Sequence, residues 1–362
     1  MTSNGLEDVV AAETVLSDVD GLAGRLVMRG SPLEALAGRV RFQDMVALLW
    51  DGFFPSLPDD LQGELGKARL EVFKAIEPML PLVADRPAFD AMRALMALLP
   101  DDTELATALK LAVAPGVVLA ALLRQKAGAG PLTPDVRLSH ATDVLRMRTG
   151  SLPRPEVAAA LDTYLVTVAD HGLNASTFAA RVVASTQAGL NSSVLAALGA
   201  LKGPLHGGAP GPVLDMLDAI GSPDNARNWI GAELARGERL MGFGHRIYRV
   251  RDPRADALKA ALGRIEQLGA VDKERMALAG IVEDTALQLL RQHKPDRRLD
   301  TNVEFYTALL LEGLGFPRDT FTAVFAAGRV IGWIAHAREQ AETGKLIRPR
   351  SRYVGPEPRQ AA

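Results

Sequence analysis

Three titratable side chains in this sequence occupy settings that suit acid/base chemistry. The chain has six histidines among 362 residues, and two of them, His206 and His245, lie in glycine-rich turns. Glycine has no Cβ and tolerates positive φ, so a ligand can approach such a turn closely and an imidazole held there can face it. A carboxylate, Glu304, follows further along the chain. Together these groups could donate and remove protons.

Other interpretations of these residues stay open from their types alone. His206 and His245 could be ordinary loop histidines. A metal site built from histidines and Glu304 is disfavoured, because no two of them share a close ligand spacing. Three other histidines, His140, His293 and His336, have no comparable setting and are expected to be structural.

The elements that must position these side chains are mainly helices. Proline and glycine fall between apolar stripes of helical period, which is typical of a mainly α protein. One short hairpin is predicted over Thr14 to Val27, with Asp20-Gly21 as its turn. Helices are predicted over residues 42–50, 59–76, 105–123, 155–168, 176–188, 192–201, 223–235, 256–268, 273–292 and 319–341.

Composition limits the possible functions. A mass of 38.6 kDa suggests two domains. The net charge of -2 and the pI near 6.3 argue against a nucleic-acid partner. A local basic run, Arg348, Arg350 and Arg352, is either a solvated tail or an anion clamp. The apolar stretch 105–123 contains Lys110 and Pro115, so a buried helix is expected there and no membrane association.

The chain contains no cysteine, which fits a reducing compartment and excludes a cysteine thioester. The first ten residues lack the basic and apolar regions of a signal peptide, so we expect a cytoplasmic protein. The sequence has no Walker A, Gly-x-Gly-x-x-Gly, His-Glu-x-x-His or Gly-x-Ser-x-Gly motif, so nucleotide hydrolysis, nicotinamide binding, zinc proteolysis and serine hydrolysis lack support.

Six motifs in one order give the chain a more specific interpretation. They are Asp170-His-Gly-Leu-Asn-Ala-Ser-Thr177, Gly203-Pro-Leu-His-Gly-Gly208, Gly242-Phe-Gly-His-Arg-Ile-Tyr248, Asp252-Pro-Arg254, Asn302-Val-Glu-Phe-Tyr306 and Ile347-Arg-Pro-Arg350. Together they resemble the citrate synthase family, and the resemblance extends from Asp20-Gly21 to the C-terminal tail.

The resemblance implies an all-α homodimer in which a large and a smaller helical domain close over the active site. It places the large domain at residues 1–211 and 317–362 and the small domain at 212–316. It also implies that acetyl-CoA condenses with oxaloacetate and that the citryl thioester is then hydrolysed. The coenzyme A thioester is a substrate, and no cofactor is expected.

The resemblance assigns a role to each site residue. Glu304 would remove the α-proton of the thioester, His206 would donate to the thioester oxygen, and His245 would polarise the oxaloacetate ketone. Oxaloacetate would be held by His171, Asn174, Arg254, Arg329 and, in the partner subunit's site, Arg348; coenzyme A would be met by Arg249. On sequence alone, His171 could instead cap a helix and Arg329 could simply cover an apolar surface.

The chain departs from the family at two positions. Glu304 replaces the usual aspartate, and Gly172 replaces a common glutamate beside His171. A displacement near 1 Å can cost about a hundredfold in rate. The alternatives are therefore 2-methylcitrate synthase, which uses propionyl-CoA, a slow enzyme, or a non-catalytic protein that binds acyl-CoA or oxaloacetate. Metal-dependent hydrolysis is a further, weaker alternative.

Overall fold

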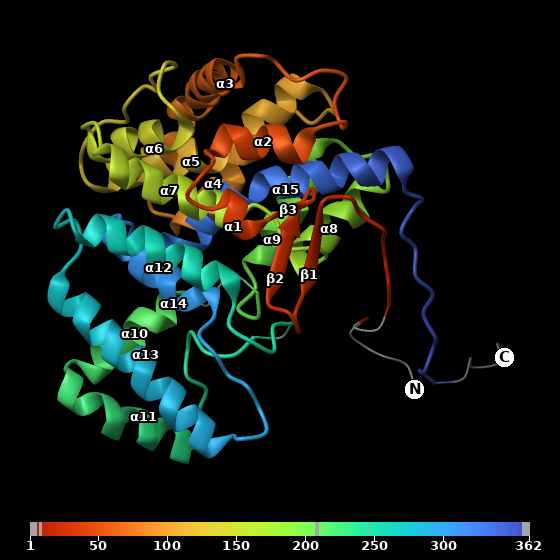
Figure 1. Cartoon of the computed structure of the whole chain (residues 1–362). Coiled ribbons are helices and arrows are strands. Elements are labelled where there is room, and N and C mark those ends of the chain that lie inside the picture. The colour runs from red at the N-terminus through yellow and green to blue at the C-terminus, as the bar shows by residue number, and fades with distance from the viewer. Residues whose placement is uncertain (1–5, 7–8, 207–209, 246, 357–362) are drawn as a thin grey trace.

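The protein is described here by a computed structural model that covers residues 6, 9–206, 210–245 and 247–356. Helices dominate it, which confirms the predicted all-α class (Figure 1). The α-helices are α1 (Leu33–Leu36), α2 (Phe42–Trp50), α3 (Leu61–Ile76), α4 (Ala88–Met96), α5 (Leu105–Lys126), α6 (His140–Thr149), α7 (Pro155–Thr167), α8 (Ala175–Ala184), α9 (Leu190–Leu201), α10 (Pro210–Ile220), α11 (Ala226–Ala235), α12 (Pro253–Glu266), α13 (Lys273–His293), α14 (Val303–Gly313) and α15 (Phe321–Thr343). The 3-10 helices are η1 (Glu77–Val83), η2 (Pro223–Asn225) and η3 (Arg318–Thr320).

The helices form two groups. In the larger group, α5 and α15 lie against one another and are surrounded by α2 to α4 and α6 to α9. The second group contains α10 to α14, and it meets the first where α12 packs against α7 (Figure 1). The domain boundaries proposed near residues 211 and 317 stay a prediction.

A small antiparallel sheet precedes the helices. Strands β1 (Ser17–Asp20), β2 (Arg25–Met28) and β3 (Ser31–Pro32) pair in that order. The predicted hairpin is present, but its turn spans residues 21–24 and not Asp20-Gly21. Asp20 still pairs with Arg25, and its side chain accepts hydrogen bonds from the amides of Leu22 and Ala23, so the carboxylate closes a longer loop.

Among the described residues, one helix is long and apolar enough to cross a membrane by length and composition, and it is α5. Most of α5 is buried inside the protein, as the sequence predicts. Lys110, the charge within this stretch, reaches Glu71 on α3 at 2.9 Å. Pairing at the edge of the core lets the helix carry a charge without burying it alone.

Three helix N-termini position residues of the predicted site. Asn174 caps α8, with its side chain accepting from the amides of Ser176 and Thr177. Asp252 caps α12, where Pro253 occupies the first turn and Arg254 follows. Asn302 caps α14 and accepts from the amide of Glu304. Side-chain caps fix the start of a helix, so these short polar residues set where the site residues lie.

Candidate active site

The turn that carries His245 depends on two glycines. Gly242 and Gly244 have φ values of 85° and 77°. A Cβ on Gly242 would lie 2.9 Å from the side chain of Phe305, and one on Gly244 would lie 2.9 Å from that of Leu299. The turn is tied to the start of α14, because the Asn302 side chain donates to the Gly244 carbonyl at 2.7 Å. Only glycine allows this path and this close approach.

The hydrogen bonds around His245 define its protonation state. Its Nδ1 accepts from the backbone amides of Ile247 and Tyr248, each at 3.0 Å, so Nδ1 carries no proton. Burial, together with the charge of Arg254, lowers the pKa of His245 to about 4. The ring is therefore neutral at pH 7, with its proton on Nε2. Its second nitrogen is a donor that faces the site.

Nε2 of His245 lies 3.2 Å from a terminal nitrogen of Arg254. A guanidinium has no acceptor, so with a proton on Nε2 both groups are donors and they do not satisfy one another. Asp252 fixes this guanidinium through both carboxylate oxygens, at 2.8 and 3.0 Å, and it also accepts from the Val303 amide at 3.1 Å. The arrangement places two donors side by side, where neighbouring oxygen atoms of a ligand can accept from them.

Glu304 lies in the first turn of α14 and is half-buried. Desolvation raises the pKa of its carboxyl to about 7, opposed by the positive charges of Arg254 and Arg329 and assisted by Asp252. A carboxyl with this pKa is divided between its charged and neutral forms at pH 7. This is the range in which a general base both holds and releases a proton efficiently.

His171 joins the same cluster. Its Nε2 lies 3.2 Å from the Tyr248 hydroxyl, and its ring centroid is 5.8 Å from that of His245. Burial lowers the pKa of His171 well below its usual value, and the neighbouring arginines act in the same direction. His171 follows α7 by four residues and its ring faces His245, so it does not serve as the C-cap of α7, which is Val168.

His206 lies in the turn before α10, and Nε2 of its ring is 2.8 Å from the Ser176 hydroxyl. That hydroxyl accepts from Nε1 of Trp333 at 3.2 Å and donates to the Asn174 side chain at 2.8 Å. His206 is thus held beside the N-terminus of α8, near Asn174. Two glycines of its motif, Gly207 and Gly208, lie outside the described residues.

Arg329 is buried within α15, and its Nε donates to the Val168 carbonyl at 2.5 Å. Burial lowers the pKa of this guanidinium to about 10, and the charge of Asp170 works against that shift. It is still positive at pH 7. Its charge contributes to the pKa values of Glu304, Asp170 and Tyr164, and its burial means that it does not cover an outer apolar surface.

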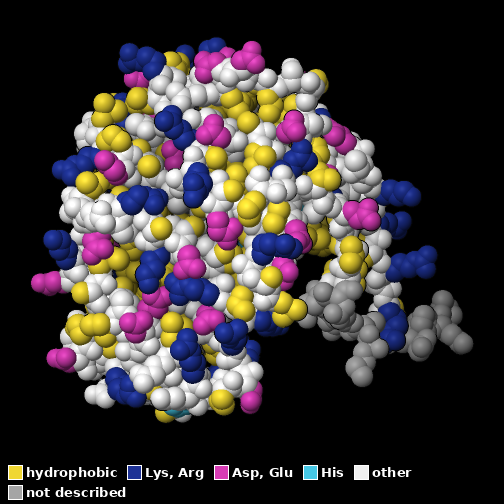
Figure 2. All heavy atoms as spheres, in the orientation of Figure 1, with side chains coloured by type: hydrophobic (Ala, Val, Ile, Leu, Met, Phe, Trp, Pro, Cys, Tyr) yellow, Lys and Arg dark blue, Asp and Glu magenta, His cyan; other side chains and the backbone are white. Residues whose placement is uncertain are grey.

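Arg249 and Arg348 lie apart from this cluster. Both are exposed, and Arg249 follows the His245 turn, where its amide donates to the Gly21 carbonyl at 2.7 Å. Arg348 lies in the extended segment after α15, which runs along the outside of the protein (Figure 1). Figure 2 shows basic and acidic side chains interspersed over the viewed face, without a large patch of one sign.

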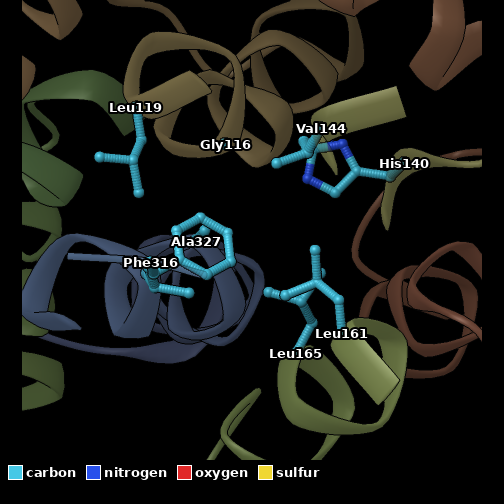
Figure 3. Close-up of a pocket in the computed structure, with 9 residues that line it drawn as sticks. Gly116, Leu119, His140, Val144, Leu161, Leu165, Phe316 and Ala327 are labelled. Carbon is cyan, nitrogen blue, oxygen red and sulfur yellow. The ribbon is translucent and has the colours of Figure 1, made fainter. Parts of the chain in front are cut away.

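A small apolar cavity lies away from the candidate site, between α5, α6 and α7. Figure 3 shows the ring of His140 at its edge, with Leu119, Leu161 and Phe316 around it. Apart from His140 its lining is apolar, so it offers no set of groups for catalysis. No cluster of three or more potential metal-ligating side chains occurs within the ranges that the structure describes.

The structure adds functional residues that the motifs did not single out. Tyr248 contacts both His171 and His245, Asp252 orients Arg254, and Ser176 holds His206. Each lies inside one of the six motifs, next to a residue with an assigned role. Their positions in the sequence were a signal, but a contact such as that between Ser176 and His206 joins segments far apart in the chain.

Comparisons with known proteins agree with the fold. Residues 5–350 match the family model described as citrate synthase, C-terminal domain. A putative citrate synthase 2 from Mycobacterium tuberculosis is 40% identical over 366 residues, covering 98% of this chain and 93% of that protein. A 2-methylcitrate synthase from the same organism is 37% identical over 368 residues, covering 98% and 91%.

A solved structure gives the same result at the level of the fold. The crystal structure of citrate synthase from Thermotoga maritima superposes with a TM-score of 0.86 at 34% identity, covering all of this chain and 98% of that one. Sequence and structure agree over the whole length. The chain therefore belongs to the citrate synthase family, and it is an acyltransferase.

Proposed function

We propose that this enzyme condenses acetyl-CoA with oxaloacetate and hydrolyses the resulting thioester to citrate and free coenzyme A. The observation that supports this most directly is the pair of neighbouring donors, Nε2 of His245 and the guanidinium of Arg254, in the same site as a carboxyl with a pKa of about 7. The oxygens of a 2-oxo acid would accept hydrogen bonds from these donors. The α-carbon of a thioester carries the weakly acidic proton that the Glu304 carboxylate would remove.

The first step is removal of a proton. Ionised Glu304 takes a proton from the α-carbon of the thioester. The N–H of His206, which the Ser176 hydroxyl accepts before substrate binds, donates instead to the thioester oxygen, where charge develops. The raised pKa of Glu304 suits this task, because a stronger base shares the proton of a weak carbon acid more readily.

The second step forms the carbon–carbon bond. The enol carbon attacks the ketone carbon of oxaloacetate while Nε2 of His245 donates to the ketone oxygen. Arg254 and Arg329 bind the carboxylates, because a guanidinium fork matches their geometry. His171 and Asn174 orient the same substrate. Water then cleaves the carbon–sulfur bond, giving a carboxylate and the free thiol.

The remaining expectations are also proposals. Coenzyme A enters as the thioester substrate and contacts Arg249, and no other cofactor takes part. The enzyme acts in the cytoplasm as a homodimer in which Arg348 extends into the partner's site. Exposure of Arg249 and Arg348 supports both contacts, since each guanidinium is accessible to a second molecule.

Release of free thiol tests the reaction. The chain has no cysteine, so a thiol reagent gives no signal from the protein. We expect thiol release from acetyl-CoA only when oxaloacetate is present, and a loss of about 10²- to 10⁴-fold in Glu304→Gln. Glu312→Gln is the matched control, because Glu312 lies on the same helix and pairs with Arg275 at the surface. If Glu304→Gln kept the rate, Glu304 would not be the base.

The same assay shows which acyl-CoA, acetyl-CoA or propionyl-CoA, is the preferred substrate. The mycobacterial 2-methylcitrate synthase is nearly as similar as the putative citrate synthase 2, so propionyl-CoA is the second candidate substrate. One methylene is worth about 1 to 3 kcal/mol of discrimination, or about 10- to 200-fold in kcat/KM. A kcat/KM ratio in favour of propionyl-CoA would reassign the substrate. Oxaloacetate binding without thiol release from either compound would favour the non-catalytic alternative.

A further inference from the structure

A buried polar network lies behind the loop that carries His171 and Asn174. Its members are Asp170, Arg181, His336 and Glu339, and none of these side chains is more than 6% exposed. They come from the loop after α7, from α8 and from α15. The sequence predicts only a structural role for His336, and none of the proposed catalytic steps uses these four residues.

The hydrogen bonds of His336 fix its state. A guanidinium nitrogen of Arg181 lies 2.9 Å from its Nδ1, and because arginine can only donate, Nδ1 is the acceptor. Nε2 therefore carries the proton and points at the Asp170 carboxylate, whose oxygens are 3.2 and 3.3 Å away. Arg181 also pairs with Glu339 and donates to Gln340 at 2.9 Å.

The network holds the loop on both sides of His171. On one side is Asp170, bound to His336. On the other, the amide of Gly172 donates to the Ser17 hydroxyl at 2.8 Å, and this hydroxyl donates to Asp170 at 2.5 Å. Gly172 has a φ of 61°, so the chain turns sharply there. Ser17 belongs to β1, so an N-terminal strand completes the support of the loop.

Helix α15 binds this segment at two points on one face. Arg329 binds the Val168 carbonyl, and His336, seven residues later, binds Asp170. Between them Gly332 allows direct contact, because a Cβ there would lie 2.2 Å from the Ala169 carbonyl oxygen. Residues 168–172 therefore lie directly on the helix, held by two polar side chains.

Stability alone gives a weak account of such a network. Buried ion pairs are often no more stabilising than apolar residues of the same shape, because desolvation offsets their attraction. A fully bonded network does fix one geometry. We propose that His336 is a positioning residue for oxaloacetate binding, which acts through Asp170 and Ser17 on the loop that carries His171 and Asn174. This inference rests on the proposed function.

The test compares His336→Leu with His336→Gln. Leucine removes the donor to Asp170, whereas glutamine keeps one donor and one acceptor. We expect the KM for oxaloacetate and its calorimetric Kd to rise about tenfold in His336→Leu, as for the loss of a good hydrogen bond in a positioned site. The KM for acyl-CoA should stay within about twofold, and His336→Gln should recover most of the loss.

His140→Leu is the matched control. His140 is as buried as His336, but it packs on Phe42 by the apolar cavity, away from the loop. Oxaloacetate binding should be unchanged in this variant. If His336→Leu binds oxaloacetate like the wild type, or if His140→Leu weakens binding equally, the inference is wrong.

Ser17→Ala covers the case in which His336→Leu does not fold. Ser17 is partly exposed, and its loss leaves the Gly172 amide without its acceptor, so oxaloacetate binding should weaken about three- to tenfold. Wild-type binding in a folded Ser17→Ala would overturn the inference. Failure of the proposed function would look different, because the wild-type enzyme itself would then release no thiol from either acyl-CoA.

Discussion

Replacing Glu304 by glutamine should stabilise the fold in a pH-dependent way. Glutamine has nearly the same shape but never ionises, so it removes the desolvation of a carboxylate. The wild-type carboxyl has a pKa of about 7 in the folded protein, against 4.5 for an ordinary glutamate. A raised folded-state pKa means that the folded protein holds the proton more tightly than the unfolded chain. The carboxyl therefore destabilises the fold increasingly as pH rises from about 4.5 to 7.

The magnitude follows from these two pKa values. At pH 8 the ionisable group costs the fold about 3 kcal/mol relative to a neutral one, or about 2 kcal/mol once its partial exposure to solvent is discounted. At pH 5 the folded state is protonated and the unfolded chain is about three-quarters ionised, so the cost falls below about 1 kcal/mol. Glu304→Gln should therefore exceed the wild type in unfolding free energy by about 2 kcal/mol at pH 8, with the gap shrinking towards pH 5.

Urea denaturation of both proteins at pH 5, 6, 7 and 8 measures this difference. Subtraction removes the pH dependence of all other groups. Glu312→Gln is the control for the substitution itself, because it replaces a carboxylate on the same helix that pairs with Arg275. A difference between Glu304→Gln and wild type that did not change with pH would refute the reasoning, since it would mean that the carboxyl has an ordinary pKa in the folded state.

Two further predictions concern the same region. The value of kcat/KM for the acyl-CoA should fall about tenfold from pH 8 to pH 6, because the ionised fraction of a base with a pKa of about 7 falls from about 0.9 to about 0.1; a profile that is flat down to pH 5 would contradict this. Tyr164→Phe should leave the unfolding free energy unchanged within about 0.5 kcal/mol or raise it, because the buried Tyr164 hydroxyl has no hydrogen-bond partner among the described residues. Loss of more than about 1 kcal/mol on urea denaturation would show that this hydroxyl is bonded.

Periodicity located most of the long helices. Residues 42–50 match α2, and the stripes predicted at 59–76, 155–168 and 273–292 match α3, α7 and α13 within a few residues. Proline and polar capping residues marked where these helices begin, as Pro155 does for α7. Helices α4, α6 and α14 escaped prediction. In α14, eight of the eleven residues are buried, so its sequence has no polar face to reveal a helical period.

The site was predictable in its residues but not in its geometry. Motif order pointed to His171, His206, His245 and Glu304, and three of these belong to one cluster of rings and charges. His245 and Arg254 both present donors to the site because two backbone amides donate to Nδ1 of His245 and because Asp252 orients the Arg254 guanidinium. Such contacts follow from how a turn and a helix meet in space, which residue spacing does not encode.

The tip of the N-terminal hairpin packs directly against the segment that follows His245. The Gly21 carbonyl accepts from the Arg249 amide, and a Cβ at Gly21 would lie 2.3 Å from the Ile247 carbonyl oxygen, so the two backbones touch. A Cβ at Gly24 would similarly lie 2.6 Å from Val250. If helices α10 to α14 swing away from the rest, this contact must break first. The amide of Arg249 would exchange its hydrogen with solvent only while the contact is broken, so its protection from exchange measures how often the two segments separate.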